Sequence, residues 1–348
     1  MAEHIPHLKA FVKLGNLFTD FCNKTESEYT DWDLKIADAL LNAEAHNGWF
    51  TQENCLRSLQ AWGAELTEEK LTQWLSTYPE IGSKPAKKIA IIMAGNIPLV
   101  GFHDFLSVLL SGHRVLAKLS SNDKILLPLV ASYLQEIDPV LVDKIEFTDK
   151  KLQDFDAVIA TGSNNTGRYF DYYFSKFPSI IRKNRNSVAI IDGTETAEDL
   201  ALLGNDIFWY FGLGCRSVSK LFVPKGYDFD HFFKGIYAHA AIINNHKYAN
   251  NYDYNKAVYL MSNYNILDNN FILLKEEKGY ASPIGCLFYE YYDNNLELQE
   301  KLKADAEQLQ CVVAKSGYEN TIDFGQTQKP ALSDYADGVD TISFLVSL

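Results

Sequence analysis

The chain has 348 residues, of which 47% are hydrophobic and 22% charged, and its formal net charge is −13. This length can form one large or two moderate domains with real cores, and the acidic balance argues against nonspecific binding to nucleic acid, which needs a basic face. Five scattered cysteines without a CxxC pair, and eight histidines without an HxxxH or HxH pair, predict neither a disulfide framework nor a metal site.

The first part of the chain, up to about residue 80, is predicted to be helical. It begins MAEHIPHLKAF, which lacks the pattern of a signal peptide, and no stretch of the sequence approaches the roughly 20 apolar residues of a membrane span. With the unpaired thiols, this favours the cytoplasm. The segment DWDLKIADALLNAEAHNGW has helical spacing and ends at Gly48, and Thr51 and Thr67 are placed to cap helices. A lid, a packing layer and an oligomer contact are all open roles for this region.

From Lys87 onward, short runs rich in β-branched residues alternate with helical segments. Strands are predicted for KKIAIIMA, RVLAKL, DAVIAT and NSVAIID, and helices for HDFLSVLLSG, NDKILLPLVASYLQEI and NNTGRYFDYYFSKF. After Asp192 the alternation repeats, with helices over 196–211 and 229–242 and strands over 218–223 and 284–290. The pattern predicts βαβ units in two doubly wound, mostly parallel α/β domains with a boundary near Asp192.

Two motifs follow predicted parallel strands. In ATGSNNTGRYF, a turn with Gly162 and Ser163 opens a helix and suits a pyrophosphate, although many glycine turns bind nothing. In AGNIPLVGFHDF, the amide of Asn96 lies at the carboxyl edge of the sheet, where it could donate to an oxyanion or cap a helix. Lys118 ends the next strand and can hold a ribose hydroxyl or a phosphate, or be a solvated surface lysine.

Cys215 differs from the other four cysteines in its surroundings. It lies in FWYFGLGCRSVSKLFVPKG, where two glycines let a ligand approach the backbone and Arg216 could favour a thiolate. A nucleophilic cysteine needs a lowered pKa, access and an oxyanion donor, and this segment is compatible with all three. The remaining cysteines are expected in the core.

Taken in order, these motifs resemble those of the aldehyde dehydrogenase superfamily. TGSNNTGR resembles its cofactor-binding turn, GNIPL and SGHRVLAKLSS its Asn-x-Pro and Gly-x-x-Val-x-x-Lys-x-Ser segments, and GLGCRSVSKLFVPKG its nucleophile segment. SPIGCLFYEYYDNNLEL resembles the Phe-Gly-Pro-Val stretch more loosely. The AGN-x-P segment and the closing FGQTQKPALSDYADGVDTISFL are similar to LuxC-type fatty acyl-CoA reductases. The likeness covers residues 85–348, within a few positions, and implies an aldehyde-dehydrogenase-like fold.

The sequence pattern and the resemblance together predict four parts of the chain. They are a helical N-terminal segment packing on the cofactor domain (1–84), a Rossmann-like cofactor-binding domain (85–191), a catalytic domain (192–325) and a C-terminal segment (326–348). The last part, with a final strand DTISFLVSL, is implied as the contact of a homo-oligomer.

The same resemblance implies residue roles. Cys215 matches the nucleophile that forms a thioester with the acyl group, and Asn96 matches the oxyanion-hole amide, with the backbone N–H of Cys215 as its partner. The implied cofactor-binding residues are Lys118, Ser120, Gly162, Ser163 and Gly167. The implied cofactor is NADPH, with NADH as the alternative.

Two carboxylates of the superfamily are missing. The general-base glutamate of the hydrolytic members would fall near Ile181, yet SIIRKNRNSVAII has no carboxylate from Ser179 to Ile191. An enzyme that forms free acids needs that base to activate water, whereas a reductase does not. The glutamate that binds the nicotinamide ribose is also absent from GYASPIG, and Glu276 and Glu277 lie upstream.

The run RKNR places Arg182, Lys183 and Arg185 within four residues. These cations could receive the phosphates of the substrate CoA or of NADP. The alternative is a solvated loop before a strand.

We therefore expect an NADPH-dependent reductase that converts acyl-CoA, of a fatty acyl type, to aldehyde through a cysteine thioester. The alternatives are another acyl-CoA or acyl-phosphate reductase of the superfamily, which a substrate panel would separate, and a non-catalytic binding relative. Faster labelling of Cys215 than of the other cysteines would exclude the latter. Aromatic residues near 169–177 and 208–211 could line an acyl tunnel or fill the core.

Overall fold

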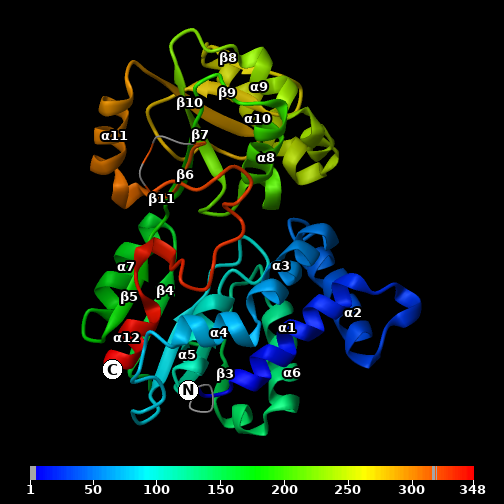
Figure 1. Ribbon diagram of the computed structural model, residues 1–348, viewed down its shortest axis with the longest axis vertical. Helices are drawn as coiled ribbons and strands as arrows, with labels where there is room; N and C mark the ends of the chain where they lie inside the picture. The colour runs from blue at the N-terminus through cyan, green and yellow to red at the C-terminus, as the bar shows by residue number, and fades with distance from the viewer. Residues whose placement is uncertain (1–4, 316–317, 319) are drawn as a thin grey trace. The chain divides into compact units, whose positions relative to one another are not determined.

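The computed structural model describes residues 5–315, 318 and 320–348, and the chain divides into two compact units (Figure 1). The first unit comprises Met1–Lys183 and Ala331–Leu348, and the second comprises Asn184–Pro330. The chain therefore passes between the units twice. The predicted boundary near Asp192 was several residues late, because β6 (Asn186–Ile190) pairs with strands of the second unit.

The first unit is built on a parallel sheet with the strand order β3-β2-β1-β4-β5. Its described strands are β1 (Lys88–Ile92), β2 (Arg114–Lys118), β3 (Ile145–Phe147), β4 (Ala157–Thr161) and β5 (Ser179–Arg182). Its described helices are α1 (Leu8–Asn23), α2 (Asp31–His46), α3 (Gln52–Glu65), α4 (Glu68–Leu75), α5 (Phe102–Leu110), α6 (Leu126–Ile137), α7 (Asn164–Phe174) and α12 (Thr341–Ser347), with short 3₁₀ turns η2 (Glu26–Glu28), η3 (Pro139–Asp143) and η7 (Ala336–Gly338). Because β1 is flanked by β2 and β4, the sheet grows in both directions from β1, as in a doubly wound fold.

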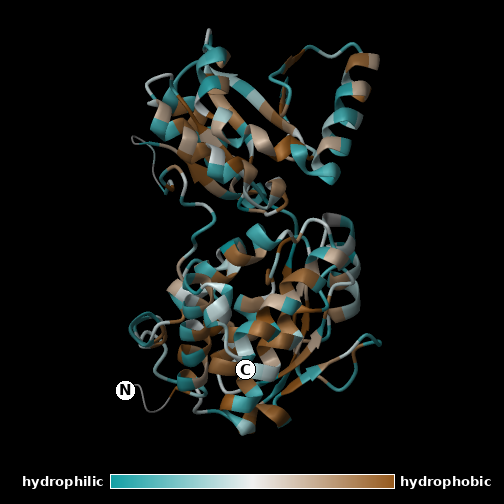
Figure 2. Ribbon diagram, turned by 90° about the vertical axis from the view of Figure 1, so that its right-hand side faces the viewer, coloured by the Kyte–Doolittle hydropathy of each residue, from teal (hydrophilic) through white to brown (hydrophobic). Residues whose placement is uncertain are grey.

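The N-terminal helices share the core of the first unit. Phe11 and Leu14 of α1 belong to the same buried cluster as Phe102 and Phe105 of α5 and Ile89 of β1. Figure 2 shows apolar residues concentrated on the strands and on the inner faces of the helices. Of the three roles open for this segment, the structure supports a packing layer.

The second unit has a sheet with the order β11-β6-β7-β10-β9-β8, in which β8 and β9 are antiparallel and the other pairs are parallel. Beside β6, its described strands are β7 (Val218–Pro224), β8 (Ile266–Asp268), β9 (Leu273–Glu276), β10 (Cys286–Tyr292) and β11 (Leu309–Val313). Its described helices are α8 (Ala197–Phe208), α9 (Phe229–Gly235), α10 (His246–Met261) and α11 (Asn295–Ala304), with the 3₁₀ turns η4 (Trp209–Gly212), η5 (Tyr237–Asn244) and η6 (Ala306–Gln308). The predicted helix over 196–211 thus ends in η4, and the one over 229–242 divides at Ile236.

The C-terminal segment differs most from the sequence prediction. DTISFLVSL forms the helix α12 rather than a strand, because Asp340 caps it by accepting the backbone N–H of Ser343 at 2.8 Å. Ile342 and Leu345 are buried in the core of the first unit, and α12 contacts α5. This apolar face is therefore covered within the chain.

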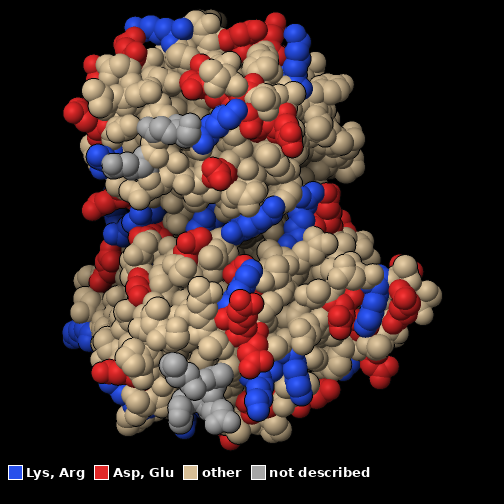
Figure 3. All heavy atoms as spheres, viewed as in Figure 1, with Lys and Arg blue, Asp and Glu red and all other residues tan. Residues whose placement is uncertain are grey.

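Charged side chains are distributed over the surface of each unit. On the face shown in Figure 3, Asp and Glu are scattered rather than gathered in one patch. Within the part of the chain that the structure describes, no helix combines the length and the apolar character needed to cross a membrane.

Candidate active site

The predicted oxyanion residue Asn96 and two of the predicted cofactor residues lie at one edge of the first sheet. Asn96 follows β1, Lys118 closes β2, and Ser163 follows β4. Because β1 pairs in parallel with both β2 and β4, the residues that follow these three strands lie at one edge. The reversal of strand order between β1 and β4 is the position where open α/β sheets bind ligands.

The turn after β4 is closed by Ser163. Its hydroxyl oxygen accepts the backbone N–H of Thr166 at 3.2 Å, which caps α7. A Cβ atom at Gly162 would lie 2.9 Å from the ring of Phe170, and one at Gly167 would lie 2.9 Å from Cγ of Lys183. Both glycines therefore allow close packing around the first turn of α7. The N–H groups at the start of that helix form a site suited to an anion.

The end of β2 is basic and polar. The Nζ atom of Lys118 donates to the carbonyl oxygen of Lys150 at 3.1 Å, and Ser120 packs so tightly on Gly95 that a Cβ there would lie 2.5 Å from the serine hydroxyl. Asp123 is buried and accepts the backbone N–H of Leu99 at 3.3 Å, and burial raises its pKa. No exposed carboxylate therefore follows β2 within the next few described residues.

Asn96 lies in the loop between β1 and α5. The residue is half-buried, and its amide oxygen is shielded from solvent. The loop continues to Phe102, where α5 begins, and includes a turn in which Leu99 has a left-handed φ of 57°.

The basic run after β5 does not act as one cluster. Arg182 is 5% exposed, its guanidinium contacts Asp104 at 2.5 Å, and it donates to the hydroxyl of Thr341 at 2.9 Å. The charge of Arg182 is therefore paired inside the first unit, which argues against the expectation that it binds a substrate phosphate. Lys183 is exposed and pairs with Asp171, and Arg185 donates to the carbonyl oxygens of Ala306 and Leu309, at 3.4 and 3.2 Å.

Cys215 is the exposed member of the five cysteines, all of which lie among the described residues and none of which is in a disulfide. It occupies the loop between η4 and β7. Burial raises the pKa of Cys22 to about 11 and those of Cys55 and Cys286 to about 12, which makes these thiols poor nucleophiles. Cys311 is also buried.

The backbone before Cys215 is in an unusual conformation. Tyr210 and Phe211 have left-handed φ values of 53° and 58°, and Gly212 follows with 73°. Non-glycine residues in this region are held there only by their surroundings, and such strain is typical of functional loops. The loop itself is fixed by the Ser187 hydroxyl, which donates to the carbonyl oxygen of Cys215 at 2.8 Å.

The sequence suggested that Arg216 favours a thiolate at Cys215, but the contacts of its side chain are with other residues. Its guanidinium donates to the sulfur of Cys311 at 3.3 Å and to the carbonyl oxygen of Thr327 at 3.4 Å. These contacts join the cysteine loop to β11 and to the segment that leaves the second unit.

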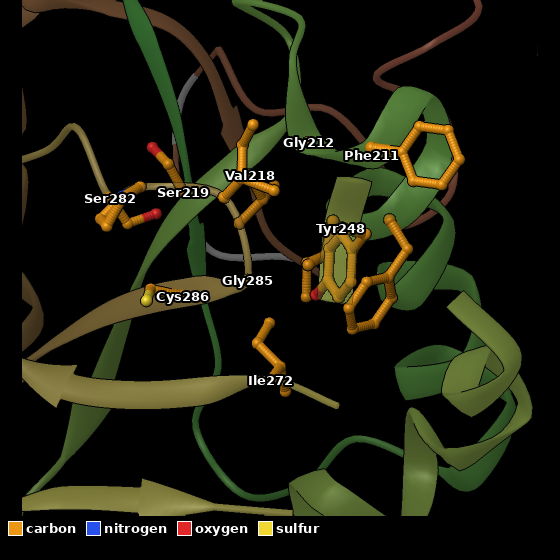
Figure 4. A pocket seen from close by; sticks show the side chains of 13 residues that line it. Phe211, Gly212, Val218, Ser219, Tyr248, Ile272, Ser282, Gly285 and Cys286 are labelled. Carbon is orange, nitrogen blue, oxygen red and sulfur yellow. The ribbon is translucent and has the colours of Figure 1, made fainter. Parts of the chain in front are cut away.

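A pocket in the second unit adjoins the cysteine loop. It is partly open, and the space between its walls, including the part continuous with solvent, amounts to about 320 Å³. Its lining residues are Ile207, Phe208, Phe211, Gly212, Val218, Ser219, Tyr248, Ile272, Ser282, Pro283, Ile284, Gly285 and Cys286. Figure 4 shows Phe211 and Tyr248 toward one end of the pocket and Ser282 and Cys286 toward the other. Residues on either side of Cys215 in the sequence, Gly212 and Val218, both line it.

Only part of the predicted aromatic lining occurs here. Phe208 and Phe211 line the pocket, whereas Tyr169, Tyr172 and Tyr173 of α7 are exposed at the surface of the first unit. Sequence reasoning missed Ser217 within the cysteine loop, and Ser187 and Gln328, which contact that loop. Serine and glutamine are too common for their positions to stand out without the fold.

Solved structures define the class of fold. Aldehyde dehydrogenase 21 from Physcomitrella patens, in complex with the reaction product succinate, matches with a TM-score of 0.66 and 12% identity, covering 99% of this chain and 84% of that one. An NAD⁺ complex of aldehyde dehydrogenase from Bacillus cereus matches with a TM-score of 0.60 and 13% identity, covering 91% and 72% of the two chains. The chain therefore has the aldehyde dehydrogenase fold.

The family is narrower than the fold. The acyl-CoA reductase (LuxC) family matches residues 20–270, and the chain belongs to this family. It is accordingly an oxidoreductase of the acyl-CoA-reducing, aldehyde-forming class. The comparison with curated protein sequences found no match.

Proposed function

We propose that this protein reduces a fatty acyl-CoA to the aldehyde with NADPH, through a thioester on Cys215. The observation that carries the proposal is the exposed thiol on a strained loop in a chain of the LuxC acyl-CoA reductase family. Cys22 is half-buried and the other three cysteines are buried, so Cys215 is the most accessible sulfur for acylation.

The chemistry at Cys215 balances without water. The thiolate attacks the acyl-CoA carbonyl carbon, the C–S bond to CoA breaks, and CoA leaves as its thiolate, which takes up a proton. A bound reduced nicotinamide would supply the hydride that adds to the carbonyl carbon of the enzyme thioester. The resulting thiohemiacetal expels the Cys215 thiolate and yields the aldehyde. Asn96 is assigned to oxyanion stabilisation by the resemblance of its AGN-x-P segment.

The residues of the first sheet fit a dinucleotide. The start of α7 and the Ser163 turn suit the pyrophosphate. A carboxylate after the second strand of such a fold usually binds the ribose 2′-hydroxyl of NAD. Here Lys118 and Ser120 stand in that region, and Asp123 is buried. A cation with hydroxyl donors suits a 2′-phosphate, so we infer that NADPH is preferred over NADH.

The acyl chain is assigned to the pocket beside the cysteine loop. Its wall includes aromatic and aliphatic side chains, such as Phe211, Tyr248 and Ile272, which suit a hydrocarbon chain. Since Gly212 and Val218 bracket the cysteine in the sequence, a chain attached to Cys215 is tethered close to this pocket. We infer that the protein is located in the cytoplasm, because a free nucleophilic thiol requires a reducing compartment. We also propose that the protein forms a homo-oligomer.

Mass spectrometry of the protein after incubation with an acyl-CoA, without cofactor, tests the proposal. The expected result is one added acyl mass on the peptide that contains Cys215. Cys215→Ser should remove this adduct, whereas Cys22→Ser, a matched change at a half-buried thiol, should leave it. An adduct that survives in Cys215→Ser, or its complete absence in the native protein, would overturn the assignment. Repeating the incubation with an acyl phosphate in place of acyl-CoA distinguishes an acyl-CoA reductase from the alternative acyl-phosphate reductase.

A further inference from the structure

A short segment near the end of the second unit is anchored by a buried carboxylate. Asp206, on α8, is completely buried. It accepts the backbone N–H of Gly325 at 2.6 Å, the backbone N–H of Thr327 at 3.0 Å and the hydroxyl of Thr327 at 2.8 Å. The segment Gly325–Gln328 is therefore fixed to the helix that leads into the cysteine loop.

The same segment holds the cysteine loop from its other side. The side-chain amide of Gln328 donates to the hydroxyl oxygen of Ser217 at 3.3 Å, and the carbonyl oxygen of Thr327 accepts from Arg216. Ser217 closes the loop internally, because its hydroxyl oxygen accepts the N–H of Gly214 at 3.3 Å and its own N–H donates to the Gly214 carbonyl at 3.0 Å. The residues directly around Cys215 are thus tied to Gly325–Gln328.

Packing alone does not require these groups. A buried carboxylate and a buried amide cost desolvation that apolar side chains of similar volume avoid. What a satisfied polar network adds is a single, well-defined arrangement of the backbone it binds. Here the backbone that the network defines is the turn with Cys215 between Gly214 and Ser217.

We propose that Gly325–Gln328, anchored by Asp206, braces the Cys215 loop in its reactive conformation, and that Gln328 is a positioning residue for the thiol. The importance of the brace for catalysis rests on the proposed function. The arrangement of the thiol can be tested separately, because alkylation of Cys215 requires neither acyl-CoA nor NADPH.

The test compares Gln328→Met with Gln326→Met. Both replace a glutamine by a side chain of similar size, but Gln328 is buried against Ser217, whereas Gln326 is exposed. The alkylation rate of Cys215 by iodoacetamide is measured by mass spectrometry from neutral to alkaline pH. We expect Gln328→Met to lower it by roughly 3- to 10-fold, the effect of one hydrogen bond. Gln326→Met should match the native protein.

Two further readouts distinguish positioning from general destabilisation. In acyl-CoA reduction, Gln328→Met should lower kcat by a similar factor and leave KM within about twofold. Adding Gln328→Met to Ser217→Ala should cost little beyond Ser217→Ala alone, because the serine change has already removed the contact between the two side chains. The brace would be overturned if Gln328→Met had the same alkylation rate and kcat as the native protein. It would also be overturned if both rates fell in proportion to the melting temperature and Gln326→Met showed the same fall. If the native protein lacks reductase activity but Gln328→Met still slows alkylation, the proposed function fails and the brace stands.

Discussion

Replacement of Arg182 by methionine should strongly destabilise the first unit. Arg182 and Asp104 are 5% exposed each, and Thr341, which accepts the second guanidinium contact, is fully buried. Methionine fills much of the volume but leaves the Asp104 carboxylate buried without its counter-charge. Breaking a buried pair in this way costs about 3–5 kcal/mol. Removing both charges, in Arg182→Met with Asp104→Leu, should recover most of that loss.

Lys183→Met is the matched control. Lys183 is the next residue, and its ion pair with Asp171 is 49% exposed on both sides, so its loss should cost at most about 1 kcal/mol. Urea unfolding followed by tryptophan fluorescence measures both variants. Four of the five tryptophans lie in the first unit, and a Trp209→Phe background removes the one in the second. If both variants lost the same small amount of unfolding free energy, the argument that Arg182 forms a buried ion pair would be refuted. A raised KM for cofactor or CoA with unchanged stability would instead restore a phosphate-binding role to Arg182.

Three other changes probe separate features. Burial lowers the pKa of His113, whose Nε2 lies 3.0 Å from the Leu345 carbonyl oxygen and whose Nδ1 accepts the Lys87 N–H at 3.2 Å. The unfolded histidine therefore binds a proton more readily than the folded one, so the contribution of this residue to stability is complete above its ordinary pKa of 6.5 and is lost as the pH falls below that value. Urea unfolding at decreasing pH should show a falling free energy of unfolding, and His113→Gln should make this fall smaller. Lys118→Met should raise KM for NADPH about tenfold and leave KM for NADH nearly unchanged, and an equal rise for both would contradict the 2′-phosphate assignment. Ser282→Phe should fill the pocket and reduce kcat/KM at least about tenfold for long acyl-CoA but little for acetyl-CoA; a uniform reduction across a chain-length series would place the acyl chain elsewhere.

The strands that the sequence predicted are those with continuous apolar runs. β1, β2, β4 and β6 are buried on both faces, so their residues read as unbroken β-branched stretches. β5 was missed because it has only four residues and leads directly into the cations. Arg182, the last residue of β5, is buried, whereas Lys183, directly after the strand, is exposed, and the sequence of like charges does not show this difference.

The end of the chain shows why local pattern was insufficient there. DTISFLVSL is rich in β-branched and aromatic residues, which favours a strand. The helix forms because Asp340 caps it and because Ile342 and Leu345, three residues apart, both enter the core of the first unit. Likewise, the exposure of Cys215 followed from its glycine-rich surroundings, whereas the partners of its loop come from residues 187 and 328, too distant in sequence for a local pattern to reveal.

The distribution of carboxylates bears on whether the proposed Cys215 thioester is reduced or hydrolysed. Hydrolysis needs a base that can take a proton from water, and no carboxylate occurs from Ser179 to Ile191. Asp206, which anchors the segment bound to this loop, is fully buried and its two oxygens accept three hydrogen bonds. Among the described residues of the second unit, Glu290 of β10 is paired with Lys220, and Glu277, directly after β9, is paired with Lys275, whereas Glu276 at the end of β9 is exposed. If Cys215 carries the proposed thioester, the lack of such a base in the 179–191 segment favours transfer of hydride to the thioester over its hydrolysis, and the product is then the aldehyde.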